Sequence, residues 1–142
     1  MIDDETRLLR WRPVHENAIH PETINHKAMD FDAKTNTPRI INNADWLLNI
    51  RLIDFLRDIG KHFPVNRMLA RDVVRSRLED GISYTEFSYI LLQSLDFRQL
   101  FLDHGVTLQF GGSDQWGNLT GGVELIRRAE GAKAHAFATP LV

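Results

Sequence analysis

The feature that most constrains this chain is a long segment with both a helix start signal and a helix stop signal. Residues 83–86 form a capping box, in which the Ser83 hydroxyl can accept a hydrogen bond from the Glu86 amide. Gly105 stands where a left-handed C-cap belongs. The pattern therefore predicts a helix from about Tyr84 to His104, against which the shorter elements must pack.

Two shorter helices are predicted before this one. Apolar residues recur at helical spacing over residues 50–59, with Gly60 in the position of a left-handed C-cap. Farther along, Asn66 is the expected N-cap of a helix over residues 68–78, which Gly81 closes. The middle of the chain is therefore predicted to be helical.

Strands are predicted on both sides of these helices. A helix over residues 116–130, closed by Gly131, separates the last two strands. Because strands alternate with helices and no tight hairpin signal occurs, the order predicts an α/β layered domain with a mainly parallel sheet. Residues 1–36 show neither periodicity and are expected to be loop or weak helix. The three predicted strands are residues 39–43, 106–110 and 134–139.

Composition excludes several classes of protein. The 142 residues are 43% hydrophobic, which is enough for a core, and the absence of cysteine excludes disulfide scaffolds and cysteine-ligated metal sites. The six histidines show no ligand spacing, so no bound metal is predicted. A net charge of −2 gives no overall basic field. Without a signal peptide or an apolar run near the roughly 20 residues of a membrane helix, we expect a cytoplasmic single-domain protein with no membrane contact.

The long helix carries a polar stripe. Tyr89, Gln93 and Asp96 fall at positions i, i+4 and i+7, and at about 100° per residue their directions span only about 60°. Most of the residues around them are apolar, so a phenol, an amide and a carboxylate aligned there need hydrogen-bonding partners. A ligand with an amine and a hydroxyl would supply those partners. A solvated stripe on an amphipathic helix is the alternative.

A glycine-containing bend follows the strand predicted over 106–110. Gly112 lets a ligand approach the backbone, and Asp114 could accept hydrogen bonds from a ribose diol at the carboxyl end of a parallel strand. The bend matches neither a dinucleotide fingerprint nor a Walker motif. The alternative is a simple turn in which Ser113 or Asp114 caps the following helix.

Positive charge gathers in two places. These groups could meet RNA phosphates, or they could be solvated helix surface and favourable charge near a helix C-terminus. The arginines are Arg67, Arg71, Arg75, Arg77, Arg127 and Arg128.

Three segments, in this order and register, resemble the bacterial tyrosyl-tRNA synthetase family: residues 54–63, 81–89 and 111–118. The likeness runs from about Phe31 to Val142. The resemblance implies a class I aminoacyl-tRNA synthetase, with a partial Rossmann-like parallel sheet, flanking helices and a helical dimerisation insertion. Such an enzyme activates L-tyrosine with ATP and transfers it to tRNA(Tyr).

The resemblance implies a role for each polar residue of the stripe. Tyr89 and Gln93 would hold the α-amino group of tyrosine, Asp96 would accept the hydrogen of its phenol, and Gln115 would lie beside the substrate near its carboxyl end. A site built around a hydroxyl rejects the analogue that lacks it, and the tyrosyl enzymes are themselves the standard example of this rule.

Nucleotide, tRNA and dimer positions are implied in the same way. Asp114 would bind the ribose of the adenylate, and Gly112 would allow close approach; ATP is a substrate, with Mg²⁺ expected beside it. Residues 46–84 resemble the insertion through which the family forms homodimers, and 84–142 the tyrosine and adenylate half. The weaker assignments are Tyr84 at the dimer interface and Arg71, Arg127 and Arg128 facing the tRNA.

The sequence also departs from the family. Neither an H-x-G-H motif nor a lysine-rich ATP loop occurs, and residues 1–30 form an irregular segment without persuasive likeness, before a partial catalytic domain over 31–142. We therefore expect half an active site, with little or no activity by this chain alone. One alternative is a non-catalytic dimerisation fragment that pairs with a full-length synthetase. A tryptophanyl enzyme is a weaker one, opposed by Asp96 and the motif at 111–118.

Overall fold

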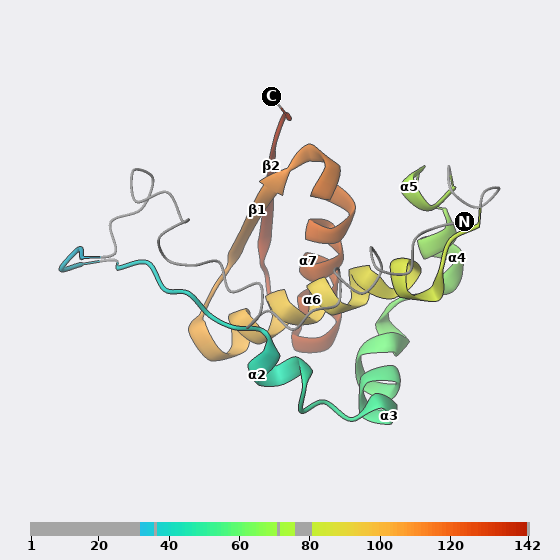
Figure 1. Cartoon of the computed structure of the whole chain (residues 1–142), viewed down its shortest axis with the longest axis horizontal. Helices are drawn as coiled ribbons and strands as arrows, with labels where there is room; N and C mark the ends of the chain where they lie inside the picture. The colour runs from blue at the N-terminus through green and yellow to red at the C-terminus, as the bar shows by residue number, and fades with distance from the viewer. Residues whose placement is uncertain (1–31, 36, 71, 76–80, 142) are drawn as a thin grey trace, which may run out of the picture. The chain divides into compact units, whose positions relative to one another are not determined.

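The computed structural model describes residues 32–35, 37–70, 72–75 and 81–141 (Figure 1). The chain divides into two compact units, Met1–Asn49 and Ile50–Val142. In the first unit the described residues form one short helix, α2 (Ala44–Leu47). The strand predicted over residues 39–43 is wrong: these residues are irregular up to the turn before α2, and Ile40 is 54% exposed. Two adjacent apolar residues carry too little pattern to specify a strand.

The second unit contains the rest of the regular structure. Its helices and strands alternate in the second half of the unit, as the sequence predicts. In chain order the elements are α3 (Leu52–Asp54), η1 (Phe55–Ile59), η2 (Gly60–His62), α4 (Val65–Leu69), α5 (Asp72–Arg75), α6 (Tyr84–His104), β1 (Leu108–Gly112), η3 (Ser113–Gln115), α7 (Trp116–Glu130) and β2 (His135–Thr139).

Helix α6 begins and ends where the sequence predicts. The Ser83 side chain accepts from the Glu86 amide at 3.2 Å, which caps the first turn. At the other end Gly105 has φ 66°, the left-handed conformation that glycine adopts without strain. Helix α7 ends in the same way at Gly131, with φ 65°. Local signals therefore delimit α6 at both ends and α7 at its C-terminal end.

Helices α6 and α7 pack against each other and form the core of this unit. The contact uses Phe97 from α6 and Ile126 from α7, both fully buried, together with Ala134 before β2. Two glycines in the middle of α7 bring the backbones close, because a Cβ at Gly121 would lie 2.8 Å from the Ser94 hydroxyl oxygen. The small residues thus allow a tighter helix contact than larger side chains would permit.

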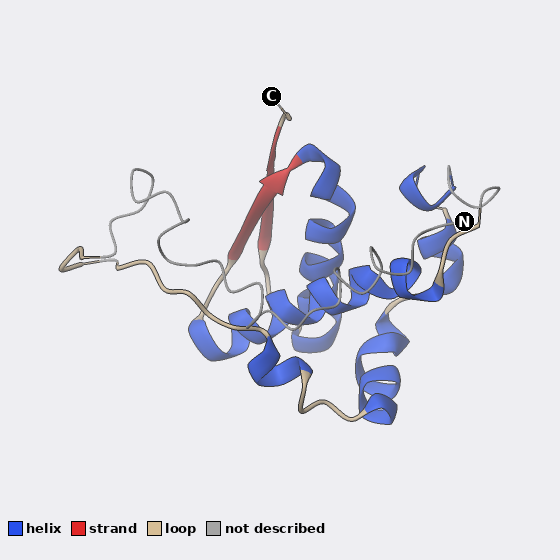
Figure 2. Ribbon diagram, viewed as in Figure 1, coloured by secondary structure: helices blue, strands red, loops and turns tan. Residues whose placement is uncertain are grey.

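Strands β1 and β2 form a two-stranded parallel sheet (Figure 2). Leu108 pairs with His135 and Gly112 with Thr139, so both strands end at the same edge. Helix α7 runs alongside the strands and connects them, as parallel pairing requires. The prediction of an α/β fold with a parallel sheet is confirmed, although the described residues form two strands rather than three.

The segment predicted as one helix over residues 50–59 is different in detail. One turn of α-helix, α3, continues as the π-helical turn η1, in which the Gly60 amide donates to the Phe55 carbonyl. The chain then tightens into the 3₁₀ turn η2, and Gly60 has φ −56°, so it is not the predicted left-handed cap. Phe55 and Ile59 face the core, whereas Leu52 is 70% exposed.

The helix predicted over residues 68–78 is also wrong in its bounds. Helix α4 begins after Pro64, which takes the cap position in place of Asn66. Proline is well suited to this place, because its fixed φ leads into a helix without needing an amide hydrogen. Helix α5 is separate, and residues 76–80 lie outside the described part of the chain. None of the described helices is long and apolar enough to cross a membrane.

Candidate functional site

Helix α6 brings the three polar residues of the stripe to one side. Because α6 is continuous from Tyr84 to His104, Tyr89, Gln93 and Asp96 share the direction that their spacing predicts. Gln93 and Asp96 are half-buried, and Tyr89 is 54% exposed. The stripe is therefore neither wholly solvated nor enclosed.

The stripe lies next to the side of α6 that contacts α7. Ser94 and Phe97, both fully buried, face α7. Gln93 and Asp96 each precede one of these residues, which places them about 100° around the helix axis. The Ser94 hydroxyl is occupied within α6, since it donates to the Ile90 carbonyl at 2.6 Å. The polar groups thus flank the α6–α7 contact.

The bend after β1 has a defined internal network. The Gln115 amide nitrogen donates to the Asp114 carboxylate at 2.8 Å, and the Asn118 amide donates to the Gln115 oxygen at 3.2 Å. Neither Ser113 nor Asp114 caps η3 or α7 through its side chain. The simple capping alternative is therefore wrong, and the exposed Asp114 carboxylate is held by its neighbour at the start of the helix.

Gly112 is needed for space rather than for an unusual backbone angle. Its φ is −67°, which any residue adopts, but a Cβ there would lie 2.6 Å from a carboxylate oxygen of Asp114 and 2.7 Å from Leu141. The sequence predicts close approach by a ligand at this glycine. In the structure, groups of the chain itself already lie against it.

Arg127 and Arg128 differ in their surroundings. The Arg127 side chain is 62% exposed and forms two hydrogen bonds of 2.8 Å with Glu124. Arg128 is 20% exposed; it donates to Glu124 at 2.6 Å and to the His62 carbonyl at 2.5 Å. Arg71, the third residue predicted to face tRNA, lies outside the described residues.

Glu124 was not singled out from the sequence, although its position could have been. It precedes Arg127 by three residues and Arg128 by four, which is ion-pair spacing on a helix. Hydrogen bonds from Arg127, then from Arg128, lower the pKa of Glu124 to about 2 against the opposing effect of burial. A long-range ion pair joins α6 and α7, since Arg98 of α6 donates to Glu130 of α7 at 2.6 Å.

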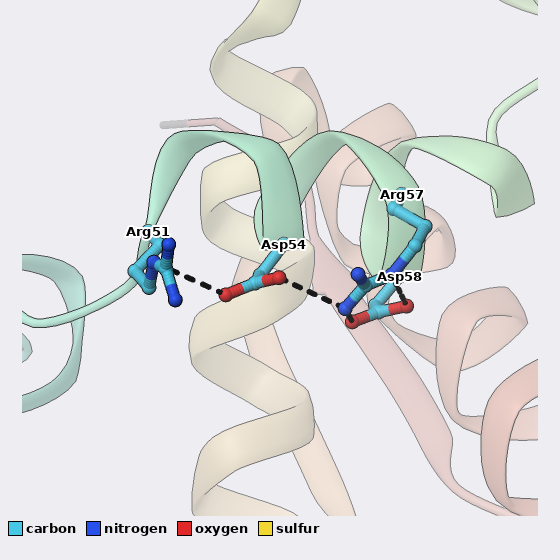
Figure 3. Close-up of polar contacts among 4 residues, drawn as sticks. All are labelled: Arg51, Asp54, Arg57 and Asp58. Carbon is cyan, nitrogen blue, oxygen red and sulfur yellow. Dashed lines mark hydrogen bonds and ion pairs between the residues drawn. The ribbon is translucent and has the colours of Figure 1, made fainter.

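A charged ladder lies along α3 and η1 (Figure 3). Arg57 bridges Asp54 and Asp58 at 2.9 and 2.8 Å, and Arg51 lies 3.8 Å from Asp54. The hydrogen bond from Arg57 lowers the pKa of Asp58. Exposed pairs of this kind add little stability.

Exposed apolar side chains lie on the same short helices as the charged ladder. The exposed apolar residues of α3 and η1 are Leu52, Ile53 and Leu56.

Among the described residues, no group of three or more histidine and carboxylate side chains is arranged to hold a metal ion. Tyr84, predicted at a dimer interface, is 72% exposed.

Comparison with known proteins agrees with the resemblance. Residues 1–142 match the family described as tRNA synthetases class I (W and Y). Tyrosine–tRNA ligase of Bacillus pumilus and tyrosine–tRNA ligase 1 of Bacillus subtilis are 60% and 58% identical to this chain over 116 residues. In both, the match covers 80% of this chain and 28% of the relative. The chain thus spans about 28% of the length of these relatives.

Solved structures give the same result. A C-terminally truncated mitochondrial tyrosyl-tRNA synthetase from Aspergillus nidulans is 31% identical, with a TM-score of 0.66 over 79% of this chain and 37% of that one. The corresponding protein from Coccidioides posadasii gives 30% identity and a TM-score of 0.62, over 71% of this chain and 33% of that one. The chain therefore belongs to the class I tRNA synthetases of the tryptophan and tyrosine group, and its resemblance to the bacterial tyrosyl-tRNA synthetases is confirmed.

Proposed function

We propose that this chain supplies the tyrosine and adenylate recognition of a tyrosine–tRNA ligase. In this proposal residues 84–142 form the substrate half, and residues 46–84 form the dimer segment of a partial catalytic domain over 31–142. L-Tyrosine, ATP with Mg²⁺, and tRNA(Tyr) are the substrates, and the reaction takes place in the cytoplasm. The main support is the side of α6 that carries the exposed Tyr89 and the half-buried Gln93 and Asp96, together with the identity to known ligases.

Each residue of the stripe has a chemical role in this proposal. The Asp96 carboxylate accepts the phenol hydrogen of tyrosine, while Tyr89 and Gln93 hold the α-ammonium group. A substrate without the hydroxyl leaves the carboxylate desolvated and without that hydrogen bond, which costs binding energy. Gln115 lies near the substrate carboxylate, and its hydrogen bond to Asp114 connects the tyrosine side of the site to the ribose side.

Catalysis in this reaction depends on position. The tyrosine carboxylate attacks the α-phosphate of ATP in line and releases pyrophosphate, so the protein must hold both reactants and stabilise the charge on the phosphates. Gly112 and Asp114 would seat the ribose. Neither ATP motif of the family occurs in the 142 residues, so we assign phosphate handling to groups outside this sequence.

Tyrosine binding tests the proposal. Calorimetric titration of the full chain with L-tyrosine and with L-phenylalanine should show a preference for tyrosine, and Asp96→Asn should remove that preference. Asp103→Asn is the matched control, because Asp103 lies on the same helix, is exposed and accepts a local hydrogen bond from Gln99. Equal binding of both amino acids by the unaltered chain would contradict the assignment. Tyrosine-dependent pyrophosphate exchange should be absent from the chain alone.

A second function, dimerisation with a like chain or a full-length synthetase, is favoured by the exposed apolar residues of α3 and η1. Leu52 and Ile53 are 70% and 68% exposed, which is costly for a surface that meets only water. Sedimentation velocity should show a concentration-dependent dimer that Leu52→Glu weakens. Leu102→Glu, at an exposed apolar position on α6, should leave the dimer unchanged.

A further inference from the structure

A pocket of about 310 Å³ lies between the segment around α4 and α7. Its walls combine apolar and charged groups from both segments. The residues that matter below are Phe63, Arg67, Met68, Glu124, Leu125 and Arg128. None of them belongs to the stripe on α6 or to the bend after β1.

The two arginines of this pocket differ in whether they can bind a ligand. Arg128 already donates to Glu124 and to the His62 carbonyl, and it thereby joins α7 to the end of η2. Glu124 is also occupied, since it accepts from both Arg127 and Arg128. Arg67 is exposed, and its side chain has no ion pair with any residue in the described part of the chain. Arg67 is therefore the guanidinium that an anion can engage.

The local electrostatic environment is positive. One carboxylate, Glu124, is shared by two guanidinium groups, so the group of three retains a positive charge before Arg67 is added. The pKa of His62 is lowered by burial first and then by Lys61 and Arg128. An anion would therefore be attracted to this pocket.

The floor of the pocket is apolar. Leu125 and Met68 are 1% and 5% exposed, and Phe63 packs against the same cluster as Met68. A pocket of this volume holds more than a phosphate group alone. We propose that it binds a phosphate together with its attached nucleoside, with Arg67 on the phosphate and the sugar or base against the floor.

The phosphate and nucleoside can belong to the acceptor end of a tRNA, in which case this inference rests on the proposed function, or to a free nucleotide, which has the same chemistry. In either case Arg128 is a positioning residue, because it holds the start of α4, and with it Arg67, against α7. A guanidinium fork suits a phosphate better than an ammonium group does.

The test uses the full chain, a fluorescent acceptor-stem RNA hairpin and adenosine monophosphate. Arg67→Gln should weaken hairpin binding about 3- to 10-fold. It should also reduce the slope of log affinity against log salt concentration by about one, as expected for the loss of one phosphate contact. The hairpin affinity of Arg67→Lys should lie between those of the unaltered chain and Arg67→Gln. Arg51→Gln is the matched control: its side chain is 88% exposed, it does not line the pocket, and its loss changes the net charge equally. It should change affinity less than twofold.

The outcomes separate the two proposals. If Arg127→Gln weakens hairpin binding but Arg67→Gln behaves like Arg51→Gln in both titrations, the pocket assignment is overturned while the RNA-facing role of α7 stands. If adenosine monophosphate binding depends on Arg67 and hairpin binding does not, the pocket holds a free nucleotide. If neither ligand depends on Arg67, the pocket does not bind nucleotides. Circular dichroism should show unchanged folding, because Arg67 is exposed.

Discussion

The α-carbon of Gly121 lies so close to Ser94 that an added Cβ would meet the serine hydroxyl oxygen at 2.8 Å. It would also lie 3.0 Å from two carbons of Ile90. Both neighbours are buried on α6, so they have little room to move. The packing of α6 against α7 thus depends on a glycine in the interior of α7.

Gly121→Ala should destabilise the fold by about 1–3 kcal/mol through overpacking, although alanine favours helix formation. Urea unfolding followed by circular dichroism measures the change. Gly60→Ala is the control, because a Cβ there meets only the Phe55 carbonyl at 3.9 Å and φ is −56°. A neutral Gly121→Ala would mean that α6 and α7 pack less closely in solution.

Gly131→Ala should cost about 1–2 kcal/mol for a different reason. No atom lies within 4 Å of an added Cβ, so the penalty comes only from φ 65°, which L residues avoid. Gly131→Asn should cost less, since asparagine tolerates this conformation. Thermal unfolding of both variants measures which of the two is more stable. Equal stability of the two variants would argue against a left-handed cap.

The Glu124 carboxylate should make stability depend on pH. Its pKa is about 2 in the folded chain, against an ordinary value of 4.5, so its ion pairs stabilise the fold fully above pH 4.5. That stabilisation is lost as the pH falls from 4.5 toward 2. Glu124→Gln should therefore be less stable than the unaltered chain at pH 7, with the difference shrinking toward pH 2. Urea midpoints at pH 7, 5 and 3 measure it; a constant difference would contradict the prediction.

The open face of the sheet should promote self-association. Phe110 and Phe137 are paired across β1 and β2 and are 68% and 56% exposed, whereas parallel sheets are normally covered on both faces. Replacing both by threonine should keep the strand propensity and reduce light scattering at high concentration. Leu102→Thr, on α6, removes exposed apolar surface elsewhere and should have a smaller effect.

The sequence predicted elements that are delimited by local signals. Both ends of α6 and the C-terminal end of α7 follow from Ser83, Gly105 and Gly131, each of which acts within a few residues. The π-helical turn η1 could not be predicted, because no local pattern distinguishes it from α-helix. The strand expected at residues 39–43 failed because a strand needs a neighbour, which a local pattern does not supply.

The same division applies to the candidate site. The shared direction of Tyr89, Gln93 and Asp96 follows from helical geometry alone. In contrast, the hydrogen bond from Arg128 to the His62 carbonyl joins positions 66 residues apart. Such a contact depends on how separate segments pack, so only the structure shows it.

The π-helical turn has a consequence for later changes to the chain. An extra residue in one turn rotates α3 relative to the turns that follow it, and here it separates inward Ile59 from outward Leu52. Deleting one residue between positions 55 and 59 would restore the ordinary α-helical repeat. The exposed apolar residues of α3 would then point in a different direction. A shortened chain of this kind would keep its composition but present a different surface to any partner.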